Sequence, residues 1–87
     1  MWYRKAAEQG DSEAQTNLGF MYETGLGVTE DLVQAYMWIN LAVSAFSPGT
    51  DRDNAVKDRS RVAGKMTPDQ IAKAQKLAAE WKPNPVQ

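Results

Sequence analysis

The residues with the greatest capacity for chemistry in this sequence are carboxylates and a pair of glycines. Glu23, Glu30 and Asp31 lie close together in the chain, and two carboxylates can divide the general-acid and general-base roles of a hydrolase. Gly25 and Gly27 would suit a phosphate-binding loop, but the third glycine, the Lys-Ser/Thr pair and a preceding strand are missing. The sequence contains no histidine and no cysteine, which removes the commonest general base and zinc-thiolate sites. We therefore predict no enzymatic activity, no cofactor and no metal site.

These residues also have structural explanations, which we favour. Glu30 and Asp31 stand where a helix is expected to begin, and the helix dipole favours acidic side chains there. Gly25 and Gly27 fall between two helical patterns, where a turn with positive φ angles favours glycine. A short chain of helical hairpins also offers little enclosure for a catalytic pair. A small carboxylate-based hydrolase is therefore the weakest of the functions that we consider.

The overall composition indicates a small folded protein with no strong charge preference. The 87 residues have room for one small domain or a few repeats, and the 43% hydrophobic content argues against disorder. With 10 basic and 11 acidic side chains the net charge is −1, too balanced for generic nucleic-acid binding. No apolar run reaches the roughly 20 residues of a membrane span, and no signal peptide is recognisable. We predict no nucleic-acid or membrane partner, and a soluble protein of the cytoplasm or the periplasm.

Apolar residues recur at helical spacing, and turn-forming residues divide the chain into separate helical segments. Five helices are expected, at 2–8, about 12–23, about 31–45, about 53–66 and 68 to about 81. Ser12, Thr29 and Thr67 are the expected caps of the second, third and fifth helices. The third helix is apolar on most of its circumference, which predicts neighbours on more than one side. The fifth is apolar on one side, as expected of an end element.

The sequence repeats itself with a period typical of helical hairpins. A shift of 36 residues places Trp2 on Trp38 and Ala6 on Ala42. Weaker matches appear at shifts of 38 and 44 residues. Helix–turn–helix units with loops of variable length give periods in this range.

The repeated residues resemble the Sel1-like repeat family, a group of α/α solenoids related to tetratricopeptide repeats. The matching positions are Trp2 to Asp11, Ala14, Gln15, Asn17 to Gly19, Met21, Tyr22, Gly25 to Val28, Asp31, Ala35, Trp38 and Ala42. The resemblance implies an all-α, right-handed α/α solenoid of helix–turn–helix repeats. The expected units are a half repeat at 2–10, a full repeat at 11–46, a diverged terminal repeat or cap at 51–82 and a tail at 83–87. Residues 47–66 depart from the family pattern, because the Gly-x-Gly turn is missing there.

Many of the matching residues have an expected packing role. Small residues let two helices approach closely, whereas leucine and aromatic residues fill the space between helices. Trp38 and Trp81 are expected in the core by their helical spacing. The full set of predicted packing residues is Ala14, Leu18, Gly19, Tyr22, Gly25, Gly27, Ala35, Trp38, Ala42 and Trp81.

The resemblance also implies a function, because the family is generally regarded as a scaffold for protein–protein contact. A non-catalytic adaptor that binds a protein or peptide partner is expected. By analogy with related helical repeats, the first helix of each hairpin lines a concave surface. The candidate contact residues on that surface are Glu13, Thr16, Phe20, Glu23, Lys57 and Ser60. Phe20 has two interpretations, as an anchor for a bound peptide or as a cover over the preceding helix.

Two alternatives concern the ends of the chain. If the chain is the last part of a longer repeat array, it would act purely as a structural cap. Trp2 and Tyr3 lack the first helix of their own hairpin, so an exposed apolar patch is expected there. Such a patch would favour a homodimer.

Charge is distributed unevenly along the chain. Residues 1–50 have a balance of −4 and residues 51–87 a balance of +3. The basic residues of the fourth helix form either a contact patch for an acidic partner or, as we prefer, a solvated face with local ion pairs. These residues are Arg52, Lys57, Arg59, Arg61 and Lys65.

Overall fold

The computed structural model describes residues 2–83, with side chains from Arg4 onward. This part of the chain folds into α1 (Trp2–Glu8), α2 (Ser12–Thr24), α3 (Leu32–Ala45), α4 (Thr50–Ala63) and α5 (Pro68–Glu80). The prediction of an all-helical fold is confirmed. No helix within residues 2–83 combines the length and the hydrophobicity needed to cross a membrane.

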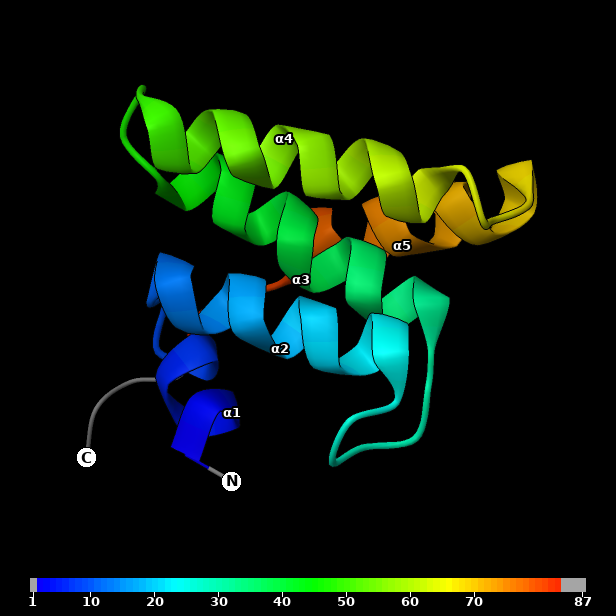
Figure 1. Ribbon diagram of the computed structural model, residues 1–87, viewed down its shortest axis with the longest axis horizontal. Helices are drawn as coiled ribbons and strands as arrows, with labels where there is room; N and C mark the ends of the chain where they lie inside the picture. The colour runs from blue at the N-terminus through cyan, green and yellow to red at the C-terminus, as the bar shows by residue number, and fades with distance from the viewer. Residues whose placement is uncertain (1, 84–87) are drawn as a thin grey trace.

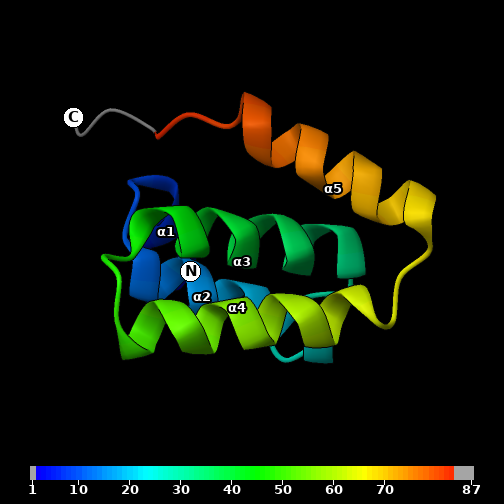
Figure 2. The same cartoon turned by 90° about the horizontal axis from the view of Figure 1, so that it is seen from above.

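The central element of the fold is α3, which packs against α2, α4 and α5, while α1 packs against α2. Figure 1 shows α3 between α2 and α4, and the view from above in Figure 2 shows it between α4 and α5. The helices α2 and α4 run in the same direction, and α5 lies on the far side of α3 from α4. The helices α2 and α4 therefore both pack antiparallel to α3, while α4 and α5 lie on opposite sides of α3 and do not pack closely on each other.

Burial follows this arrangement. Half of α3 is buried, including Tyr36, Met37 and Trp38 in consecutive positions. In contrast, α5 has a single buried residue, Ala74. A helix with neighbours on several sides needs apolar residues around most of its circumference, and an end helix needs them on one side. The two-sided third helix and the one-sided fifth helix are therefore confirmed.

The hydrophobic core has two parts, one on each side of α3. The first part joins α1, α2 and α5 to Trp38, and the second joins α4 and α5 to Ile39. Trp38 is 3% exposed and meets Trp81 edge to face, with the ring centroids 6.0 Å apart. Trp81, expected inside the fifth helix, lies just after it and is only partly buried.

The helices α2 and α3 approach each other closely at Gly19. A Cβ atom on Gly19 would lie 2.5 Å from Cγ1 of Ile39 and 3.1 Å from the carbonyl oxygen of Ala35. Both distances are shorter than ordinary contacts between carbon or oxygen atoms. The hydrogen atom of glycine is what allows these two helices to touch along their backbones.

The α2 and α3 caps differ from those expected. The N-cap of α2 is Asp11, whose carboxylate accepts from the backbone N–H of Ala14 at 3.0 Å, so the prediction of Ser12 is wrong. The N-cap of α3 is Asp31, which accepts from the N–H of Gln34 at 3.1 Å, so Thr29 is also wrong. In each case an aspartate one or two positions away makes the charge-assisted bond.

The helix α4 begins and ends three residues earlier than expected. Gly49 precedes it with a φ of 152°, and Gly64 follows it. Lys65 and Met66 continue in a turn, donating to the carbonyl oxygens of Val62 and Ala63. Met66 still packs against the core, which explains why the apolar pattern resembled a longer helix.

The α5 cap is confirmed and gives a first testable prediction. Thr67 Oγ1 accepts from the N–H of Gln70 at 3.1 Å, and Gln70 Oε1 accepts from the N–H of Thr67 at 2.9 Å. We expect Thr67→Ala to lower the free energy of unfolding by about 1 kcal/mol, because the first turn of α5 loses this partner. Urea unfolding measures the change. Ser44→Ala, which removes an exposed hydroxyl near the end of α3, is the matched control. Equal effects of the two substitutions would argue against the cap.

Candidate functional site

The first hairpin helix, α2, presents three of the predicted contact residues toward the outside of the fold. Glu13 is exposed, and Phe20 is 49% exposed. Thr16 is half-buried, and its hydroxyl donates to the carbonyl oxygen of Ser12 at 3.0 Å. About half of the Phe20 surface is therefore accessible to a partner, and the other half is covered by the protein itself.

A groove of about 330 Å³ lies between α2 and α4. Its lining residues are Glu13, Thr16, Asn17, Phe46, Asp51, Asn54, Ala55 and Asp58. Two of the predicted contact residues, Glu13 and Thr16, are among them. Lys57 and Ser60 are exposed on α4 but do not line the groove, and neither does Phe20.

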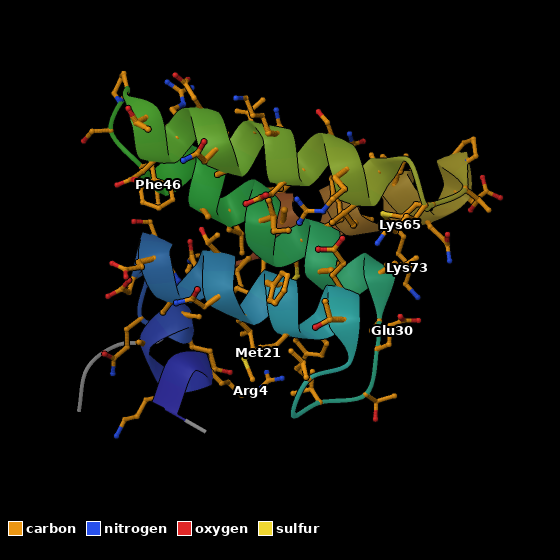
Figure 3. The ribbon with its side chains drawn as sticks, in the orientation of Figure 1. Arg4, Met21, Glu30, Phe46, Lys65 and Lys73 are labelled. Atoms are coloured by element: carbon orange, nitrogen blue, oxygen red, sulfur yellow. The ribbon has the colours of Figure 1, made fainter. Side chains whose placement is uncertain are left out.

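The aromatic ring of Phe46 stands at one end of this groove. Figure 3 shows it between the start of α4 and the start of α2. Phe46 caps the C-terminus of α3, and its backbone N–H donates to the carbonyl oxygen of Ala42 at 2.9 Å. A second hollow of about 440 Å³ borders the turn between α3 and α4 and shares Phe46 and Asp51 with the groove. The two hollows are therefore neighbours, with Phe46 and Asp51 between them.

The residues of α4 that line the groove were not indicated by the sequence pattern. Asp51, Asn54, Ala55 and Asp58 are spaced three and four residues apart, so they share one face of the helix. That spacing is visible in the sequence, but which polar flank of α4 faces α2 depends on how the helices pack. Phe46, which follows α3 and lines the groove, is half-buried and was not among the predicted contact residues.

Glu23 is placed differently from the prediction that it faces a partner. It is 5% exposed and bridges α2 to α4, so its assignment to the open surface is wrong. Arg61 donates to its carboxylate through Nη2 at 2.7 Å and Nε at 3.0 Å, and Lys65 Nζ donates at 3.0 Å. These bonds link residues that are 38 and 42 positions apart in the chain. The spacing of residues within one helix therefore could not predict them.

The environment of Glu23 changes its acidity. The hydrogen bonds from Arg61 lower the pKa of the Glu23 carboxyl most strongly, burial opposes them, and Lys65 adds to the lowering. The resulting pKa is about 2, compared with 4.5 for the free side chain. The same pairing raises the pKa of the Arg61 guanidinium. A carboxyl that stays ionised at neutral pH has no proton to give as a general acid.

The basic residues of α4 are largely engaged within the chain. Besides its bonds to Glu23, Arg61 forms an ion pair with Asp58 at 2.8 Å. Arg59 Nη1 donates to Asn40 Oδ1 at 2.8 Å, and Lys65 binds Glu23. This arrangement favours the interpretation of α4 as a helix with internal ion pairs over that of an open basic patch.

The remaining carboxylates singled out in the sequence do not converge on a reactive centre. Asp31 caps α3, and Glu30 is exposed in the preceding loop. Gly25 and Gly27 adopt φ angles of 75° and 76° in the turn between α2 and α3. Among residues 2–83, no cluster of three or more Asp or Glu side chains is arranged to hold a metal ion. The side chains of Trp2 and Tyr3, expected to favour a homodimer, lie outside the described residues.

The chain matches the model of a known repeat family in two segments. The family model described as Sel1 repeat matches residues 1–11 and 12–45, just over half of the chain. The second match coincides with the hairpin of α2 and α3, and α4 and α5 lie beyond it. No curated protein matches the chain at a significant level.

Proposed function

Because this chain belongs to the Sel1 repeat family, whose repeats are generally protein–protein interaction modules, we propose that it binds a segment of a partner protein on the face formed by α2 and α4. The proposal is non-catalytic, in keeping with a family that is typically without enzymatic activity. We further propose that α1 corresponds to the second helix of one repeat, α2 and α3 to a complete repeat, and α4 and α5 to a diverged terminal repeat.

The observation that carries the proposal is the groove between α2 and α4. Both helices pack on α3 and run in the same direction, and residues of both line a depression of about 330 Å³. At their C-terminal halves the ion pairs of Glu23 with Arg61 and Lys65 hold the two helices together. A preformed depression on a rigid helical framework loses little conformational entropy when a peptide binds.

The exposed aromatic ring of Phe20 supports the same face. Phe20 lies on α2, three to four residues beyond the groove residues Thr16 and Asn17, which places it on the same side of the helix. Aromatic residues are enriched among those that contribute most of the binding energy in protein interfaces. A partner segment that follows α2 from the groove toward its C-terminus would cover this ring.

A second candidate function is that of a structural cap. One side of α5 packs against the core, and its other side carries exposed polar residues such as Lys73, Lys76 and Glu80. Terminal repeats of solenoids need such a polar outer face to remain soluble. This role concerns α5 and is compatible with binding by α2 and α4.

We expect Phe20→Ala and Glu13→Lys to reduce recovery of the partner in a pull-down from cells. Phe20→Ala removes exposed aromatic surface, and Glu13→Lys reverses a charge at the groove. The control is Lys76→Glu, a charge reversal on the exposed side of α5. Quantitative mass spectrometry should identify proteins whose recovery falls with Phe20→Ala and Glu13→Lys but is unchanged with Lys76→Glu.

The opposite pattern would point to the structural-cap function. If every protein recovered with the wild type is also recovered in equal amount with Phe20→Ala and Glu13→Lys, the α2 and α4 face does not bind it. Circular dichroism of each variant confirms that the helical fold is retained, so that a loss of recovery reports on the surface.

A further inference from the structure

We propose that the groove between α2 and α4 selects a basic segment of its partner, an extended peptide in which a lysine or arginine lies beside apolar residues. This proposal rests on the proposed function and names the chemistry that the α2 and α4 face recognises. Three features of the groove support it: the sign of its charges, the position of its aromatic ring and the second hollow beside it.

The charged residues that line the groove are all acidic. Glu13 comes from α2, and Asp51 and Asp58 come from α4, while no described lining residue is basic. Asp58 shares its charge with Arg61, whereas Glu13 and Asp51 are exposed in the first turns of their helices. A cationic group entering the groove would therefore meet negative charge from both helices.

Two observations favour a basic peptide over a metal ion as the occupant of the groove. The acidic residues come from separate helices and, within the described part of the chain, do not gather into a cluster that could hold a metal ion. The groove also contains the side-chain amides of Asn17 and Asn54, which can donate to and accept from a peptide backbone. These amides could form hydrogen bonds with the backbone of a peptide that lies between α2 and α4.

Phe46 adds an apolar surface beside these charges. Its ring lies between the starts of α2 and α4 at the end of the groove where Asp51 is found (Figure 3). Lysine and arginine carry long apolar stems, and both are attracted to the face of an aromatic ring. A ring next to a carboxylate therefore suits a basic side chain better than a purely apolar one.

A second hollow beside the groove favours an extended segment. The groove of about 330 Å³ and the hollow of about 440 Å³ at the α3–α4 turn are neighbours, because Phe46 and Asp51 line both. Each volume is in the range that holds a small ligand or a few side chains. A peptide that runs from one hollow to the other would place its basic residue next to the shared pair, Phe46 and Asp51.

Selection from a phage-displayed library of random nine-residue peptides tests this proposal. The expected result is enrichment of lysine and arginine, with depletion of acidic residues, in peptides selected by the wild type. Selection on the double variant Glu13→Gln/Asp51→Asn should lose this enrichment. The most enriched peptide, synthesised with a fluorescent label, should bind about twofold to fivefold more weakly to Asp51→Asn, as expected for one exposed charge pair.

Matched controls separate charge in the groove from charge elsewhere. Asp69→Asn makes the same change in the first turn of α5, outside the groove, and should leave the affinity unchanged. Raising the sodium chloride concentration should weaken binding to the wild type more than binding to the double variant, because salt screens exposed charges. Light scattering of the free chain shows whether the groove is filled by a second copy.

The outcomes distinguish this proposal from the proposed function. Peptides without basic enrichment whose binding shifts the NMR signals of α2 and α4 would overturn the basic selectivity and leave the interaction face standing. Peptides that shift only signals elsewhere, or no selected peptides at all, would overturn both. A dimer that the double variant abolishes would show that the occupant is a second copy, and saturable Ca²⁺ binding at Glu13 and Asp51 would show an ion site; either result contradicts the proposal.

Discussion

Replacing Gly19 by alanine is expected to lower the free energy of unfolding by about 2 kcal/mol, because the added methyl group overpacks the contact between α2 and α3. The new Cβ would lie 2.5 Å from Cγ1 of Ile39. Ile39 is 1% exposed and β-branched, so its side chain cannot turn away from the clash at low cost. The second close atom is the carbonyl oxygen of Ala35, at 3.1 Å, which belongs to the α3 backbone. Relief therefore requires that the two helices move apart.

The sign of this prediction opposes the intrinsic helix preference. Alanine is favoured over glycine in a helix interior by about 1 kcal/mol, so a position without tertiary contacts would gain stability. Gly64→Ala is the control, since Gly64 has right-handed helical angles and a Cβ there would lie 3.4 Å from the carbonyl oxygen of Arg61, an ordinary contact distance. Urea unfolding followed by circular dichroism should show a loss for Gly19→Ala and little change for Gly64→Ala. A Gly19→Ala protein as stable as the wild type would mean that α2 and α3 are not in close contact there.

Stability is expected to fall as the pH drops from about 5 toward 2, with Glu23 as a major cause. Its pKa is about 2 in the folded protein, against 4.5 for the free side chain, because Arg61 and then Lys65 bind the ionised form despite the opposing effect of burial. Above the unfolded value the carboxyl is ionised in both states, and its full contribution to stability is present. Between 4.5 and about 2 the unfolded chain takes up the proton first, so the contribution is progressively lost.

The size of this contribution is about 2 kcal/mol at neutral pH. A shift of one pKa unit corresponds to about 1.4 kcal/mol, and the value is reduced here because the partner side chains remain in contact with water. The side chains of Arg61 and Lys65 are 46% and 51% exposed, whereas that of Glu23 is 3% exposed. Glu23→Gln should therefore be less stable than the wild type at pH 7, and the difference should shrink at pH 3.

The measurement compares urea unfolding of the wild type and Glu23→Gln at several pH values between 7 and 2.5. Other carboxylates also respond to acid, so the informative quantity is the difference between the two proteins. Glu13→Gln, on the exposed side of α2, should follow the wild type throughout. A difference for Glu23→Gln that stays constant across this range would show that the carboxyl is not held ionised by Arg61.

Most of the helical framework follows from interactions between residues close together in the sequence. The capping box of Thr67 and Gln70 involves residues three positions apart, and it was predicted correctly. The apolar circumference of the 31–45 segment correctly predicted the central position of α3. The prediction erred at the starts of α2 and α3, where Ser12 and Thr29 were expected to cap. The capping hydrogen bonds are accepted instead by the nearby carboxylates of Asp11 and Asp31.

The candidate surface was predicted only in part, for a geometric reason. The buried residues Ala55 and Val62 mark an apolar stripe on α4 that has two polar flanks. Asp51, Asn54 and Asp58 lie along the edge of this stripe that faces α2, while Lys57 and then Ser60 lie further round the helix, toward its outer side and away from the groove. The sequence shows both flanks equally well. Which one faces α2 is settled by the way α4 packs on α3.

The carboxylates Glu23 and Asp31 illustrate the same division. The amino-acid pattern alone was enough to indicate a helical repeat, the turn at Gly25 and an acidic helix start at Asp31, because each depends on bonds that span a few residues. The role of Glu23 could be known only from the folded chain, since its partners Arg61 and Lys65 lie 38 and 42 positions away. The packing of α2 and α4 on α3 brings these charges together at one end and leaves the acidic groove open at the other.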